Sequence, residues 1–194
     1  MPYRNRRLQS SAPPPPTAEE KLEKLNTAMR AVMTDDMRMV VSCIPGHIEV
    51  GKVYDMALNT SAASEAPPRQ VKASLLHLAL YHQAYHCAKL FLHLGAPVEA
   101  SESELGDTAL HCAARICGHS FVQLLLEYGA CPSSLNAAKD TPLHLAAERG
   151  RVHSVAELLA KGAPTDAKNR YQETPWDVAY LAGSPSSWCV LTLS

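Results

Sequence analysis

One six-residue pattern recurs along this 194-residue chain at a nearly constant spacing. It occupies residues 74–79, 108–113 and 141–146, with a weaker copy at 174–179. The first three copies are each followed by a Gly-Ala pair whose Gly lies 18 residues after the histidine of the copy. A period of 33 to 34 residues predicts a stack of similar supersecondary units, because no such unit can bury its apolar face alone.

The third copy shows why each unit should be a pair of helices. Thr141 is a good N-cap, and Pro142 then falls at the first helical position, where its missing N–H costs nothing. Leu143 begins a narrow apolar face, Gly150 ends the first helix and Gly162 ends the second. The expected fold is therefore all-α. The low aromatic content of 6% agrees with closely spaced helices.

The segment Thr-Pro-Leu-His-Leu-Ala at 141–146, repeated at this period, resembles the signature of the ankyrin repeat. The resemblance covers about residues 71–183. It implies an all-α ankyrin-repeat solenoid of stacked helix-turn-helix units, with projecting β-hairpin fingers near 97–107, 132–140 and 164–173. It also implies a structural role for the histidines, whose rings should hydrogen-bond close to the Thr cap of each first helix.

The chain divides into four parts on this interpretation. Residues 1–16 form a disordered basic and Pro-rich tail, and residues 17–44 a degenerate N-terminal helical capping unit. Residues 45–70 are an insertion or linker in which 53–58 can form a short helical turn and 61–68 are mobile. Residues 71–194 are ankyrin repeats, of which the last is truncated.

Two departures from the family pattern carry predictions. Only the first finger keeps a Gly before the cap, as Gly106, whereas Lys139 and Gln172 stand at this place in the next two. The weak fourth copy lacks the Gly-Ala pair, so we expect an uncapped C-terminal repeat that promotes self-association.

Composition argues against several classes of function. A net charge of −1 speaks against nucleic acid as a partner, and no apolar run is long enough for a membrane span. The sequence has no Gly-x-Gly phosphate loop and no Cys-x-x-Cys pair, so neither a cofactor nor a metal is expected. Stacked helices offer no deep cleft for catalysis, and we predict no enzyme and no catalytic residue. Without a secretory signal, the six cysteines indicate reduced thiols and a cytoplasmic or nuclear location.

Recognition of a protein partner remains. The resemblance implies binding through the concave side, at finger tips and exposed first-helix positions. Tyr81, Ile116 and Tyr171 are apolar or aromatic where a non-binding face favours Lys and Glu. Charge is also graded, from acidic residues in the first finger to basic ones in the last. The predicted partner-binding residues are Tyr81, His82, Glu104, Leu105, Asp107, Arg115, Ile116, Asp140, Glu148, Arg149, Arg170, Tyr171, Glu173 and Leu181.

Three roles of this kind stay open. The first is a non-enzymatic adaptor or scaffold. The second is the substrate-recognition part of a ubiquitin-ligase receptor, as in ankyrin proteins that end in a SOCS box, which here would require a longer form. The third is an ankyrin-type kinase inhibitor, although the insertion at 45–70 and the basic tail are departures from that class.

Overall fold

The computed structural model describes residues 17–43, 51–58, 69–102 and 104–184. The tail 1–16, the mobile segment expected at 61–68 and the end of the chain from 185 lie outside these residues. The elements follow the order α1 (Ala18–Met33), α2 (Met37–Cys43), β1 (Val53–Leu58), β2 (Arg69–Ser74), α3 (Leu75–Tyr81), α4 (Tyr85–His93), α5 (Ala109–Ile116), α6 (His119–Glu127), α7 (Pro142–Glu148), α8 (Val152–Ala160) and α9 (Pro175–Leu181).

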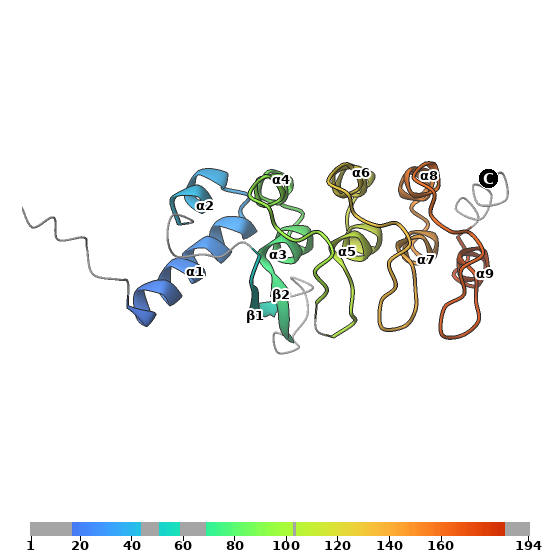
Figure 1. Ribbon diagram of the computed structural model, residues 1–194, viewed down its shortest axis with the longest axis horizontal. Helices are drawn as coiled ribbons and strands as arrows, with labels where there is room; N and C mark the ends of the chain where they lie inside the picture. The colour runs from blue at the N-terminus through green and yellow to red at the C-terminus, as the bar shows by residue number, and fades with distance from the viewer. Residues whose placement is uncertain (1–16, 44–50, 59–68, 103, 185–194) are drawn as a thin grey trace, which may run out of the picture.

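The described helices stack as antiparallel pairs along one axis (Figure 1). The first helices α3, α5, α7 and α9 form one row, the second helices α4, α6 and α8 form another, and the connecting fingers project on the side away from the second row. The predicted all-α repeat solenoid is therefore confirmed. Among the described residues no helix is both long and apolar enough to cross a bilayer.

The core between repeats is built from the residues that the pattern places there. Leu76 of α3, Leu110 of α5 and Leu143 of α7 are fully buried, and so is Leu158 of α8. Small alanines beside them let neighbouring helices approach closely. The Gly at the end of each second helix has a positive φ, as with φ 79° at Gly162, so the chain turns out into a finger there.

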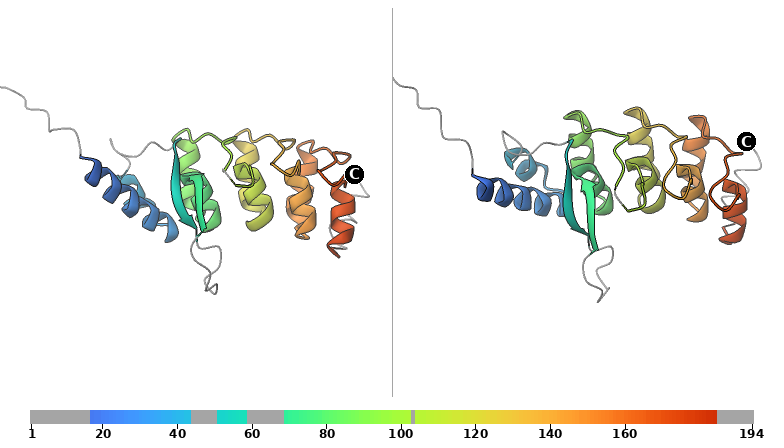
Figure 2. Two further views of the ribbon diagram at one scale, coloured as in Figure 1. Left: turned by 90° about the horizontal axis from the view of Figure 1, so that it is seen from below. Right: turned by 60° about the horizontal axis from the view of Figure 1, so that its bottom comes forward.

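The segment at 53–58 corrects the prediction of a helical turn, since it is a β-strand. Residues Val53–Leu58 pair antiparallel with Arg69–Ser74, from Val53 opposite Ser74 to Leu58 opposite Arg69. The pair directly precedes α3, in the place that the other fingers have before α5, α7 and α9 (Figure 2). The boundary predicted at residue 70 thus falls inside a strand, and residues 53–58 of the predicted linker form one strand of the two-stranded sheet that precedes α3.

A single aspartate fastens the N-terminal helix pair to the first repeat. Helix α4 has no side-chain cap of its own. Asp35 supplies one, because its Oδ1 accepts the Cys87 backbone N–H at 3.0 Å and its Oδ2 lies 2.8 Å from His86 Nδ1. Burial alone would raise the pKa of Asp35, but these hydrogen bonds prevail and lower it. The cap therefore holds best above the range in which the carboxylate protonates.

The finger turns without glycine form nonetheless. Lys139 and Gln172 have φ values of 63° and 64°, the conformation that Gly106 has with φ 64°. A side chain in this left-handed region costs about 1–2 kcal/mol. The turn is therefore imposed by the hydrogen bonds around it rather than by local preference.

We expect Leu143→Ala or Leu158→Ala to lower the free energy of unfolding by about 2–5 kcal/mol, because the packed repeats cannot close over the cavity. Urea unfolding followed by circular dichroism measures the loss. Unchanged midpoints for both variants would contradict the repeat register.

Lys139→Gly and Gln172→Gly should each raise the free energy of unfolding by about 0.5–1 kcal/mol. Relief of left-handed strain outweighs the greater entropy of an unfolded glycine. Gly106→Ala is the matched control and should lower the free energy of unfolding, since the new Cβ would lie 3.0 Å from the Ala137 nitrogen. Thermal unfolding that shows both glycine variants to be less stable would refute this account of the turns.

Candidate protein-binding surface

The first helices and the fingers enclose two adjacent hollows in the described part of the chain. The central hollow, of about 470 Å³, lies between the second and third repeats, and the C-terminal hollow, of about 390 Å³, lies between α7 and α9. They share Asp140, Leu145 and Glu148, so they adjoin, and the two together are called the trough. The predicted residues that line the central hollow are Glu104, Leu105, Arg115, Asp140, Glu148, Arg149 and Arg170, and those that line the C-terminal hollow are Asp140, Glu148, Tyr171, Glu173 and Leu181.

The remaining predicted residues lie outside these two hollows. Tyr81 is half-buried, and its hydroxyl donates a 2.6 Å hydrogen bond to Glu102 Oε2. Ile116 packs against the core, while its carbonyl accepts a hydrogen bond from Arg151. His82 is the half-buried C-cap residue of α3. These three positions therefore contribute to folding.

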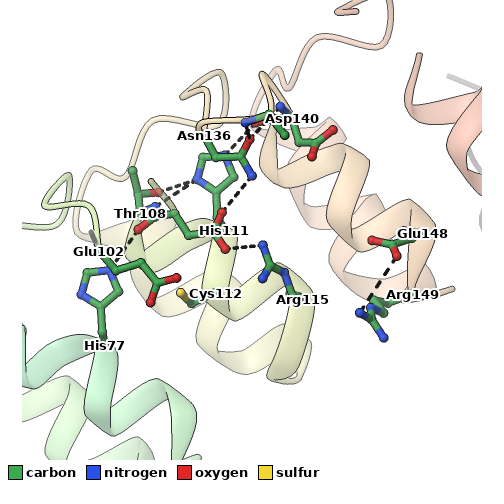
Figure 3. A network of polar contacts seen from close by, with 12 residues as sticks. His77, Glu102, Thr108, His111, Cys112, Arg115, Asn136, Asp140, Glu148 and Arg149 are labelled. Atoms are coloured by element: carbon green, nitrogen blue, oxygen red, sulfur yellow. Dashed lines mark hydrogen bonds and ion pairs between the residues drawn. The ribbon is translucent and has the colours of Figure 1, made fainter. Parts of the chain in front are cut away.

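Asp107 corrects the expectation of an exposed finger carboxylate, because it is fully buried. Its Oδ2 pairs with Arg115 of α5, and its Oδ1 accepts a hydrogen bond of 2.8 Å from Asn136 Nδ2. Figure 3 shows Arg115 and Asn136 in this polar network. Asp107 is thus a buried anchor between two fingers and has no surface left for a partner.

Asp140 and Glu173 occupy the equivalent place in later fingers and are half-buried. The Asp140 carbonyl lies 2.9 Å from His111 Nε2, and the Glu173 carbonyl lies 3.1 Å from His144 Nε2. Because a carbonyl only accepts, each ring nitrogen must donate. The backbone carbonyls of both residues thus hold the fingers in place, and both residues also line the C-terminal hollow.

Two asparagines shape the fingers and were missed by the sequence analysis. Oδ1 of Asn136 accepts the backbone N–H groups of Ala138 and Asp140, both at 2.9 Å, and Asn169 does the same for the next finger. The 33-residue spacing between the two asparagines was a signal that could have revealed them. In the first finger Glu102 takes their place, since its N–H bonds the Asp107 carbonyl as that of Asn136 bonds Asp140.

The charge gradient is weaker than predicted. Of the acidic residues expected on the first finger, Glu102 and Asp107 are buried and only Glu104 is exposed. Burial raises the pKa of Glu102, and the nearby Asp107 raises it further, although the hydrogen bond from Tyr81 works against both effects. The acidic end of the trough therefore does not lie at this finger.

Glu102, Asp107 and Cys112 bring three potential metal-ligand atoms within 4.8 Å of one another. Each has a protein partner already: Tyr81 for Glu102, Arg115 and Asn136 for Asp107, and the Tyr81 hydroxyl, 4.0 Å away, for the thiol. Burial also keeps the pKa of the Cys112 thiol well above its ordinary value. The cluster is built as a closed network around an arginine, which a cation would have to displace.

Arg115→Met is expected to lower the free energy of unfolding by about 3 kcal/mol, because it leaves the Asp107 carboxylate buried and unpaired. The double variant Asp107→Asn with Arg115→Met should recover most of this loss. A chemical-denaturation double-mutant cycle measures both. If the two effects simply add, the pair does not act as a unit.

Glu102→Gln should gain stability relative to the parent chain as the pH rises. A raised folded-state pKa means that Glu102 contributes most below its ordinary value of 4.5 and that this contribution is lost as the pH rises through the folded-state value. The glutamine side chain of the variant does not titrate, and it can still accept the Tyr81 hydroxyl. Unfolding curves at several pH values test this. A stability difference that stays constant with pH would contradict it.

Parts of the chain are similar to segments of much longer proteins. It is 34% identical over 110 residues to human SH3 and multiple ankyrin repeat domains protein 2, which covers 57% of this chain and 6% of that protein. The Nuclear factor NF-kappa-B p105 subunit of Mus musculus is 38% identical over 95 residues, 48% of this chain and 10% of that protein. Ankyrin repeat and SOCS box protein 11 of Pongo abelii is 34% identical over 119 residues, 61% of this chain and 35% of that protein.

A family-wide comparison reaches further along the chain. The family described as "Ankyrin repeats (3 copies)" matches residues 28–136 and again residues 118–193. These ranges include most of the stacked repeats, their histidine caps and both hollows. The chain therefore belongs to the ankyrin repeat family, whose repeats are modules of protein–protein interaction.

Proposed function

We propose that this chain is a non-enzymatic adaptor that binds a protein partner through the trough formed by the two hollows. The observation that carries the proposal is that the two hollows adjoin, so that their combined lining reaches from Glu104 to Leu181 across three fingers. At its C-terminal end Tyr171 and Leu181 are 73% and 69% exposed. Large exposed side chains beside a concave surface are typical anchors for a partner.

The chemistry of the repeats supports a binding role rather than catalysis. Burial raises the pKa of the Cys117 thiol to about 12, and it is the main cause that raises the pKa of the Cys87 thiol to about 12 as well. Neither is therefore a reactive thiolate at neutral pH. The histidines at the caps engage both ring nitrogens in hydrogen bonds within the fold, as His111 does with Thr108 and Asp140. We also propose a cytoplasmic or nuclear location, which suits such buried, unpaired thiols.

Affinity capture from cells, with quantitative mass spectrometry, tests the proposal. The double variant Tyr171→Ala with Leu181→Ala should retain about a tenth of the captured partner or less, which corresponds to a loss of about 1.4 kcal/mol or more. Glu157→Ala on α8, in the row of second helices, is the matched control and should capture as much as the parent chain. The reverse pattern would place binding on the second helices.

The identity of the captured protein then separates the three roles. Cullin and elongin subunits would support a ubiquitin-ligase receptor, a kinase would support an inhibitor, and other partners would support a scaffold.

A second contact surface is proposed on α9. Trp176 and Tyr180 stack with ring centroids 5.5 Å apart and an interplanar angle of 4°. Trp176 stands where Leu143 stands one repeat earlier, but it keeps 37% exposure while Leu143 is buried. We propose that a second copy of the chain docks on this pair. Sedimentation velocity should show an oligomer that Tyr180→Lys dissociates, and a parent chain that stays monomeric at high concentration would contradict this.

A further inference from the structure

The C-terminal hollow is lined by apolar as well as acidic side chains. Leu145 of α7, Val178 and Leu181 of α9, and Tyr171 of the adjoining finger are among them. Its volume of about 390 Å³ lies within the range of about 300–1,000 Å³ in which proteins hold small ligands. A single long side chain can therefore enter it, and the exposed Tyr171 and Leu181 would lose contact with water when it does.

The charges around this hollow have one sign. Asp140, Glu148 and Glu173 line it, and its lining includes neither lysine nor arginine. His144 does not balance them, because burial lowers the pKa of its ring and keeps it neutral. Both Asp140 and Glu173 accept a hydrogen bond of 3.1 Å from Asn169 Nδ2, and this neutral donor leaves their charges in place.

The central hollow differs in this respect. Its lining contains the three arginines Arg115, Arg149 and Arg170. Arg115 is paired with the buried Asp107, so Arg149 and Arg170 are the two that offset its acidic residues in part. Arg149 approaches Glu148 only to 4.0 Å, the outer limit of an ion pair, and both side chains are about half exposed. Glu148 thus stands at the border between a hollow that contains arginines and one that contains none, and its carboxylate is accessible to a ligand.

Resting on the proposed protein-binding function, we propose that the C-terminal hollow receives an arginine side chain of the partner protein. The alkyl stem would cover Leu145, Val178 and Leu181 while the charged head stays at the rim. The planar guanidinium can bond Glu148 with two N–H groups and lie against the Tyr171 ring. The acidic residues would repel an acidic side chain, and a purely apolar side chain would leave them without a partner.

A library of random 12-residue peptides displayed on phage is the probe. The immobilised full-length chain should select peptides that share an arginine at a fixed position. A synthetic copy of the best peptide is then measured by fluorescence anisotropy. Replacing its arginine by methionine, which keeps length and apolar character, should weaken binding about tenfold.

Variants of the protein locate the arginine. Glu148→Gln keeps the shape of the side chain and removes its charge, and it should also weaken the peptide about tenfold. With the methionine peptide the same variant should have little further effect, because the two changes remove one interaction. Glu157→Gln on α8 is the matched control, with an expected change of less than twofold. Circular dichroism confirms that each variant is folded.

Several results would overturn the inference. The first is a selection in which the peptides share no arginine, whether they carry lysine or no basic residue, and the second is a selection in which no peptide depends on the trough for binding. The third is a methionine peptide that binds within twofold of the arginine peptide, and the fourth is a Glu148→Gln variant that binds the arginine peptide as the parent chain does. One of these results can occur while Tyr171→Ala with Leu181→Ala abolishes capture of the cellular partner. The proposed function then stands, and only the arginine site is refuted. If that double variant captures normally, the proposed function itself has failed.

Discussion

Three buried imidazoles link each repeat of the stack to the finger that follows it. Nδ1 of His77, His111 and His144 lies 2.8–2.9 Å from the hydroxyl of its own helix cap, and Nε2 lies 2.9–3.2 Å from a carbonyl of the next finger. Burial lowers the pKa of all three rings, so they stay neutral. A neutral ring with Nε2–H satisfies both contacts, whereas a charged ring would lose the acceptor that the cap requires.

This linkage holds the proposed binding surface in place without a partner. Each ring holds a finger against the helix before it, and Asn136 and Asn169 fix the turns of the two later fingers. Neighbouring fingers are also joined directly, as by the Ala137 N–H to the Leu105 carbonyl at 2.9 Å. A trough held in this way loses little conformational entropy on binding, which leaves more of the contact energy for affinity.

The helices were predictable because their signals are local and repeated: the cap at Thr141, the buried Leu143 and the Gly after each second helix. The strand Val53–Leu58 was not, since its partner strand lies beyond an intervening segment and only pairing decides its conformation. The burial of Asp107 was not predicted for a similar reason, because it depends on Arg115 and on Asn136 of the next finger. Of the proposed site, the sequence indicated many of the residues that line the two hollows but not which charges remain exposed there.

The protonation state of the three rings tests the account most directly. Two-dimensional ¹H–¹⁵N NMR that correlates ring nitrogens with ring protons distinguishes the two neutral tautomers from the charged ring. The account predicts that His77, His111 and His144 are neutral with the proton on Nε2, and that each ring has a pKa below 6.5, the ordinary value for histidine. Rings that carry the proton on Nδ1, or that have a pKa at or above this ordinary value in the folded chain, would contradict the linkage on which the trough depends.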